Sequence, residues 1–172
     1  MPGNNHQPTS LDQPRCAVIS ISDARTDEAD RPGTLMQQRL EKAGFRIARR
    51  GVVEDDPPTV GRVLDALAEE QNVSAVLFNG SAGLRTEKRS FDAVTERMER
   101  RLPGFGEMFR QIAREEIGMG AMMLRGEAGL YRDMVVVALP GSVKAVKLAM
   151  DHLIAPPLRE LVGQIRGQEA SS

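Results

Sequence analysis

Short, almost wholly apolar runs of strand length constrain the fold of this chain most strongly. They read RCAVISI, VSAVLFN and MVVVAL, and stretches with helical spacing separate them. Strands that are apolar on both faces have to be covered on both sides, which parallel sheets achieve with helices packed on each face. We therefore predict an α/β protein, a three-layer α/β/α sandwich with a mostly parallel sheet.

The segments between these runs show the period of an amphipathic helix. In residues 58–70, Val60, Leu64 and Leu67 fall on one helical face. The same criterion predicts a helix in GTLMQQRLEKAG with Thr34 as its N-cap, and a helix after Ser142 that this serine caps. Further predicted elements are a strand at 45–53, an apolar helical stripe formed by Phe91, Val94, Met98 and Leu102, a helix from Phe105, and a turn between two strands at Arg132–Asp133.

Composition and length restrict the class of protein. The 172 residues suit one domain, predicted at 15–166 between flexible polar tails at 1–14 and 167–172. The net charge of −1 argues against a nucleic-acid partner, and no apolar run reaches the ~20 residues of a membrane span. A single cysteine, Cys16, cannot form an internal disulfide and fits a reducing compartment. We expect a cytoplasmic protein without a signal peptide.

Several familiar catalytic motifs are absent from the sequence. It contains neither the lysine-bearing phosphate loop nor the three-glycine dinucleotide fingerprint. His6, His152 and Cys16 cannot supply a zinc site of a known type. The chemistry must therefore come from other residues.

Polar and small residues gather where predicted strands end. In an open parallel sheet the ligand lies outside the carboxyl ends of the strands, so four junctions together would form one pocket. The junctions read SISDAR, VVEDDPP, FNGSAGLRTEKRS and LPGS. Their candidate ligand-binding residues are Ser22, Asp23, Asp55, Asn79, Gly80, Ser81, Ala82, Gly83, Pro140, Gly141 and Ser142.

Each junction also has a purely structural interpretation. The NGSAG loop lets backbone N–H groups approach a phosphate closely, but it also suits a tight turn. Asp55 and Asp56 precede a helix, so one carboxylate can cap it while the other reaches a Mg²⁺ ion bound to substrate phosphates. These alternatives stay open at the level of sequence.

Taken together, five segments in the same order resemble the molybdenum cofactor biosynthesis family of molybdopterin-binding domains. The segments are SISDAR…DRPG, VVEDDP, VLFNGSAGL, LPGFGEMFRQIAREEIG and VVVALPGSVKAVKLAMDHLIAPPL, within 15–161. The family includes molybdopterin adenylyltransferase and the related B protein, and the segments PGFGEMFR…EEIG and PGS are closer to the B protein.

The resemblance implies a fold, two ligands and a reaction. It implies a homo-trimer or hexamer that binds molybdopterin and an adenine nucleotide and transfers AMP from ATP to the pterin phosphate with Mg²⁺. Carried over by position, Gly80, Gly83, Gly141 and Ser142 would line the site. Asp55 would be the catalytic carboxylate and metal ligand, and Glu107 a polar pocket residue.

This chain departs from the family pattern in the loop. The family usually has Thr-Gly-Gly-Thr-Gly followed by an aspartate, whereas here the loop is NGSAG and Lys88 occupies the aspartate position. A lysine cannot ligate Mg²⁺, although it attracts phosphate as a point charge. Two hypotheses follow: adenylyl transfer that is weakened or lost, with Lys88 as the altered catalytic residue, or a non-catalytic protein that binds pterin, nucleotide or another partner.

Overall fold

A six-stranded sheet forms the centre of the molecule. The computed structural model describes residues 13–24, 26–84 and 89–167, so most of the predicted tails lies outside the described residues. The strands stand in the order β2-β1-β3-β6-β5-β4. Parallel pairing joins the first four of them, and β5 runs antiparallel to both of its neighbours, which confirms the mostly parallel sheet. Their bounds are β1 Arg15–Ile21, β2 Arg46–Val53, β3 Ala75–Asn79, β4 Arg100–Arg101, β5 Glu127–Tyr131 and β6 Met134–Leu139.

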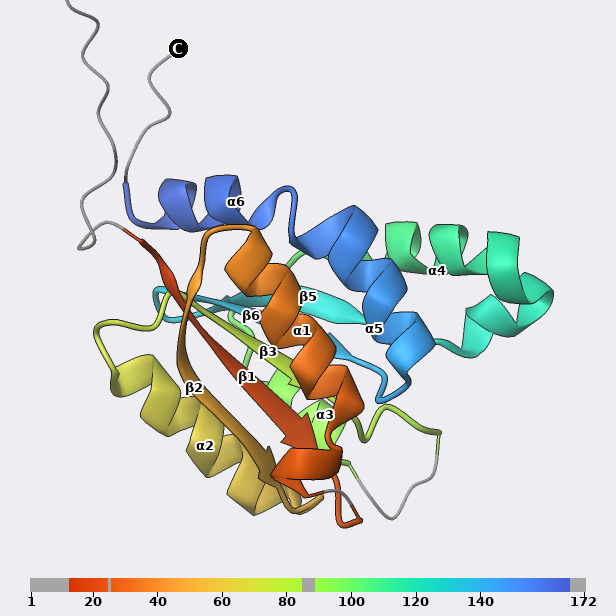
Figure 1. Ribbon diagram of the computed structural model, residues 1–172, viewed down its shortest axis with the longest axis horizontal. Coiled ribbons are helices and arrows are strands. Elements are labelled where there is room, and N and C mark those ends of the chain that lie inside the picture. Colours follow the sequence, from red (N-terminus) through yellow and green to blue (C-terminus); the bar gives the residue numbers. More distant parts are fainter. Residues whose placement is uncertain (1–12, 25, 85–88, 168–172) are drawn as a thin grey trace, which may run out of the picture.

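Helices cover both faces of the sheet, which confirms the three-layer sandwich (Figure 1). Side chains alternate along β1, so Cys16 and Val18 enter the core on one face while Ala17 and Ile19 enter the core on the other. The first core is covered by α1 Arg31–Lys42, α4 Pro103–Ile117, α5 Val143–Ala149 and α6 Leu158–Ile165, and the second by α2 Pro57–Glu69 and α3 Ser90–Thr95. Short turns of 3-10 helix at Asp27–Ala29 and Gly118–Met123 and of π-helix at Met150–Ile154 complete the helical segments.

Helices α1, α2 and α5 each begin at a residue whose side chain caps the helix. The prediction of Thr34 as the cap of α1 is wrong, because the Asp30 carboxylate accepts the Gly33 N–H at 3.1 Å. Thr34 lies one turn inside the helix and donates its hydroxyl to the Asp30 carbonyl oxygen. The predicted cap of α5 is confirmed, since Ser142 Oγ accepts the Ala145 N–H at 3.1 Å.

The helical stripe predicted from Phe91 to Leu102 ends early. Helix α3 stops at Thr95 because the chain then pairs with the edge of the sheet. The Glu99 N–H donates to the Leu130 carbonyl and the Leu102 N–H to the Ala128 carbonyl, both at 2.8 Å. An open strand edge offers backbone partners that outweigh the local period of the sequence. The predicted helix from Phe105 and the turn at Arg132–Asp133 are confirmed.

The topology places the predicted junctions at one edge. Strands β1, β2, β3 and β6 are parallel neighbours, so their carboxyl ends share one rim of the sheet. We call this edge the carboxyl rim. Within the described residues, no helix is long and apolar enough to cross a membrane.

Candidate functional site at the carboxyl rim

Hydrogen bonds between loops join the ends of the four parallel strands. The Asp55 N–H donates to Asp23 Oδ1 at 2.9 Å, and Ser81 Oγ donates to Asp55 Oδ1 at 2.7 Å. The Gly80 N–H donates to the Leu139 carbonyl oxygen at 3.0 Å, directly before Pro140, Gly141 and Ser142 in the chain. The junctions after β1, β2, β3 and β6 therefore converge, as the sequence predicts.

The loop at residues 79–83 turns sharply as it leaves β3. Gly80 has a φ of 105°, and a Cβ there would stand 2.2 Å from the Ile21 carbonyl oxygen, so only glycine fits. Ser81 follows with a φ of 54°, in the left-handed region. Gly83, in contrast, is not among the residues with a positive φ. The turn therefore depends on Gly80 and Ser81.

Asn79, the last residue of β3, is anchored beneath the rim. Its side chain is fully buried and donates from Nδ2 to Ser20 Oγ at 2.6 Å and to Met36 Sδ at 3.5 Å. These contacts tie the start of the loop to β1 and α1. The Asn79 amide thus helps to hold the loop in place, whereas the sequence had indicated Asn79 only as a candidate ligand-binding residue.

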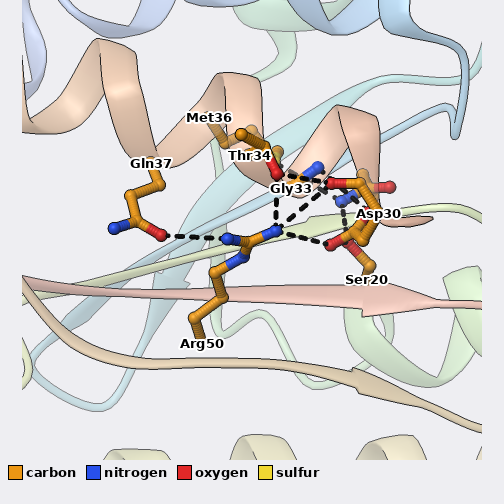
Figure 2. A network of polar contacts seen from close by, with 8 residues as sticks. Ser20, Asp30, Gly33, Thr34, Met36, Gln37 and Arg50 are labelled. Atoms are coloured by element: carbon orange, nitrogen blue, oxygen red, sulfur yellow. Dashed lines mark hydrogen bonds and ion pairs between the residues drawn. The ribbon is translucent and has the colours of Figure 1, made fainter. Parts of the chain in front are cut away.

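Ser20 also belongs to a buried polar network between α1 and the sheet (Figure 2). The Ser20 hydroxyl donates to Asp30 Oδ2 at 2.6 Å, and Arg50 Nη2 stands 3.7 Å from the same carboxylate oxygen. Arg50 also donates to Thr34 Oγ1 at 2.7 Å and to Gln37 Oε1 at 3.2 Å. Sequence reasoning missed Ser20 and Arg50, because their partners are distant in the chain. The one sequence signal for the network is a polar serine within an otherwise apolar strand.

The two aspartates before α2 have separate roles. Asp56 caps the helix, accepting the Thr59 N–H at 3.0 Å and the Thr59 hydroxyl at 2.6 Å. The Thr59 hydroxyl and then its N–H hold the pKa of Asp56 below the usual carboxyl range. Capping thus falls to Asp56, and the half-buried Asp55 faces Ser81 instead.

The carboxylates of the rim suit a Mg²⁺ ion that a nucleotide brings with it. Within residues 13–24, 26–84 and 89–167, no three His, Cys, Asp or Glu side chains stand close enough to form a metal centre of their own. Asp55 and Asp23 adjoin each other through the Asp55 N–H. One or two carboxylates together with substrate phosphates are the usual ligands of Mg²⁺. These residues therefore fit a metal that is shared with a bound polyphosphate.

Two other candidate residues lie apart from this group or cannot be placed. Glu107 on α4 is exposed and lines a separate hollow of about 270 Å³ with Arg101 and Arg110. The contacts of the described residues do not join Glu107 to Asp55 or Ser81. Lys88 lies outside the described residues.

Burial raises the pKa of Cys16 to about 12, so its thiol stays protonated and is no nucleophile at neutral pH.

Comparisons with known proteins agree on one family. A family model described as a probable molybdopterin binding domain matches residues 17–160. Molybdenum cofactor biosynthesis protein B of Bacillus subtilis (strain 168) is 41% identical over 162 residues, which cover 94% of this chain and 95% of that protein. A crystal structure of a molybdenum cofactor biosynthesis protein B superposes with a TM-score of 0.87 at 34% identity, covering 93% of this chain and 100% of the other. The tungsten cofactor synthesizing protein MoaB from Pyrococcus furiosus superposes with a TM-score of 0.78 at 27% identity, covering 90% and 98%.

Proposed function

Because this chain belongs to the family of probable molybdopterin binding domains and is similar to molybdenum cofactor biosynthesis protein B, we propose that its carboxyl rim binds molybdopterin and an adenine nucleotide. We further propose that transfer of AMP from ATP to the pterin phosphate is weakened or lost. Both parts concern the same rim, so one site carries both ligands.

One observation supports the location most directly. Asp23, Asp55 and Ser81 come from three different strand junctions and form one hydrogen-bonded chain. Gly80 lies directly before Ser81 in this hydrogen-bonded series, and its N–H donates to the carbonyl oxygen of Leu139 at the end of β6. An edge where several parallel strands end is the usual ligand position in open α/β sheets.

The proposed chemistry is mainly one of position and charge. Two polyanions have to be held side by side while an α-phosphate is attacked and pyrophosphate leaves, which requires orientation and stabilisation of the developing charge. The loop at 79–83 would orient the phosphates through its backbone and side-chain donors. Asp55, with Asp23, would hold a Mg²⁺ ion that neutralises phosphate charge when it is bound.

Two departures from the family pattern support weak transfer. Lys88 stands where the family has an aspartate, and lysine offers no oxygen to a metal. In addition, the loop lacks both family threonines, and the asparagine at the first of these positions, Asn79, donates from Nδ2 to Ser20 on β1. The chain therefore keeps the fold and the carboxyl rim, but it differs from the family in residues that would stabilise charge during transfer.

Calorimetry and a turnover assay test this proposal together. We expect the purified chain to bind ATP in the presence of Mg²⁺ and to release pyrophosphate only slowly when molybdopterin is added. Rapid pyrophosphate release would contradict weakened transfer and would show that the chain is a fully active adenylyltransferase. Binding of neither ligand would contradict the proposed function and favour the alternative of a domain that binds another partner.

The variant Lys88→Asp separates a missing metal ligand from a defective loop. If the aspartate is all that transfer lacks, the variant should release pyrophosphate at least about tenfold faster, the size of effect that metal-site residues commonly have. Lys88→Ala is the control, because it removes the positive charge without adding a ligand. A Lys88→Asp variant that binds ATP but stays as slow as the parent would place the defect in the loop.

Assembly and location complete the proposal. The family resemblance implies a homo-trimer or a hexamer, and the composition of the chain led us to expect a cytoplasmic protein. Light scattering should then give three or six times the 18.8-kDa mass of the chain. A monomeric mass would contradict this part without affecting the ligand proposal.

A further inference from the structure

Ser81 has a backbone conformation that a serine rarely adopts. Among the described residues other than glycine, only Ser81 and Arg132 have a positive φ, at 54° and 51°. The left-handed region is unfavourable for a residue with a Cβ and free of this penalty for glycine. Strain of this kind persists where the surroundings demand it, and it gathers at functional sites.

The side chain of Ser81 has a specific partner. Its hydroxyl donates to Asp55 Oδ1 at 2.7 Å, across the gap between the loops after β3 and β2. The backbone of Asp55 is fixed too, because its N–H donates to Asp23. Among the described residues, Asp55 Oδ2 has neither a hydrogen bond nor an ion pair. One carboxylate oxygen is therefore held and the other is left for a ligand.

A glycine at position 81 would fit the turn better but would lack this contact. The family loop that NGSAG resembles has glycine there. This chain instead has a strained residue whose hydroxyl reaches the carboxylate proposed to meet the metal. If the turn served only to reverse the direction of the chain, serine in place of glycine at position 81 would bring no advantage.

We infer that Ser81 is a positioning residue, which orients Asp55 for a metal-bound phosphate group through the hydrogen bond to Oδ1. The inference rests on the proposed function and adds to it the residue that sets the geometry of its key carboxylate. Groups that orient a metal ligand commonly change metal affinity by about 10- to 100-fold when they are removed. Ser81 should act at the lower end of this range, since it makes one hydrogen bond.

The affinity for Mg²⁺-ATP, measured by calorimetry, tests the inference with two variants of Ser81 and with Asp55→Asn, alone and combined with Ser81→Ala. Ser81→Ala removes the hydroxyl and keeps the strain, whereas Ser81→Gly removes both. We expect each variant to bind Mg²⁺-ATP about tenfold more weakly than the parent, and the glycine variant to have the higher thermal midpoint of the two. In an Asp55→Asn background, Ser81→Ala should cause no further loss, because the two residues act as a unit.

Arg132 supplies a matched control. It has the same strained backbone but lies in the β5–β6 turn, at the opposite end of β6 from the carboxyl rim. Arg132→Gly should relieve strain without changing the affinity for Mg²⁺-ATP. A change in affinity equal to that of Ser81→Gly would overturn the inference, because relief of strain anywhere would then have the same effect.

Two results distinguish failure of the inference from failure of the proposed function. A parent that binds Mg²⁺-ATP with a Ser81→Ala variant of equal affinity would overturn the inference and leave the proposed function standing. A parent that binds neither Mg²⁺-ATP nor the pterin would overturn both. An additive loss in the double variant would also contradict the inference, since Ser81 would then act independently of Asp55.

Discussion

Two carboxylates at successive strand junctions, Asp30 and Asp55, are held in opposite ways. Asp30 is 1% exposed, and its oxygens accept the Ser20 hydroxyl and the Gly33 N–H, with Arg50 beside them (Figure 2). Asp55 is half-buried and accepts one hydrogen bond, from Ser81. A carboxylate enclosed by the protein stabilises the fold, whereas one that keeps an oxygen available can bind something else.

The enclosed carboxylate also supports the open one. Ser20 donates to Asp30 and accepts from Asn79, so one hydroxyl connects the cap of α1 to the residue where the loop begins. Gly33 is required in this arrangement, because a Cβ there would lie 1.9 Å from Asp30 Oδ2. The buried network therefore fixes the base from which Ser81 reaches Asp55.

The largest expected effect on stability comes from breaking the enclosed site. Asp30→Ala leaves the Ser20 hydroxyl, the Gly33 N–H and the Arg50 guanidinium without their carboxylate, so we expect a loss of about 3 kcal/mol in the free energy of unfolding. Urea denaturation followed by circular dichroism measures it. A loss below about 1 kcal/mol would show that Asp30 is not the structural carboxylate proposed here.

Asp92 on α3 is paired with two arginines, Arg89 and Arg125, and this pairing gives a pH dependence. The hydrogen bond from Arg125, with a further one from Arg89, lowers the pKa of Asp92 in the folded protein although partial burial opposes this. A lowered pKa means that the stabilisation is complete above the usual carboxyl range near ~4 and is lost as the pH falls through the folded value. Asp92→Asn should therefore cost about 1 kcal/mol at neutral pH and progressively less as the pH falls below the usual carboxyl range.

Urea denaturation of the parent and of Asp92→Asn at neutral and acidic pH checks this expectation. The two stabilities should approach each other in acid, because the parent loses the charge that the variant never had. A difference that stays constant across the pH range would contradict the assignment of this ion pair.

The smallest effect on stability is expected at the open carboxylate. Asp55→Asn keeps the size of the side chain and still accepts a hydrogen bond, so the free energy of unfolding should change by less than about 1 kcal/mol. The affinity for Mg²⁺-ATP should nevertheless fall about tenfold, because the proposed metal ligand is neutralised. Calorimetry and urea denaturation on the same preparation measure both. A large loss of stability with unchanged affinity would reverse the comparison between Asp30 and Asp55.

Features with a local cause were predictable from the sequence. The apolar runs that became β1, β3 and β6 predicted a sheet covered on both faces, and the order of strands and helices predicted the shared rim. The cap at Ser142 depends on residues three positions apart, so its chemistry is visible in the chain.

Features that depend on contacts distant in sequence were not predictable. The end of α3 depends on pairing of residues 99–102 with β5, which overrides the helical stripe. Ser20 meets Asn79 only because β1 and β3 are neighbours in register. The contact between Ser81 and Asp55 likewise needs the left-handed turn at residue 81, and a serine gives no local signal for such a turn.

The proposed function requires that the ligand binds at the carboxyl rim. A crystal structure of the chain soaked with Mg²⁺-ATP would show where the nucleotide binds. We expect phosphate density within hydrogen-bonding distance of the backbone at residues 80–83, with Asp55 against the metal or its bound phosphate. Nucleotide bound elsewhere, for example in the hollow beside Glu107, with the rim free of it, would contradict a ligand site at the rim.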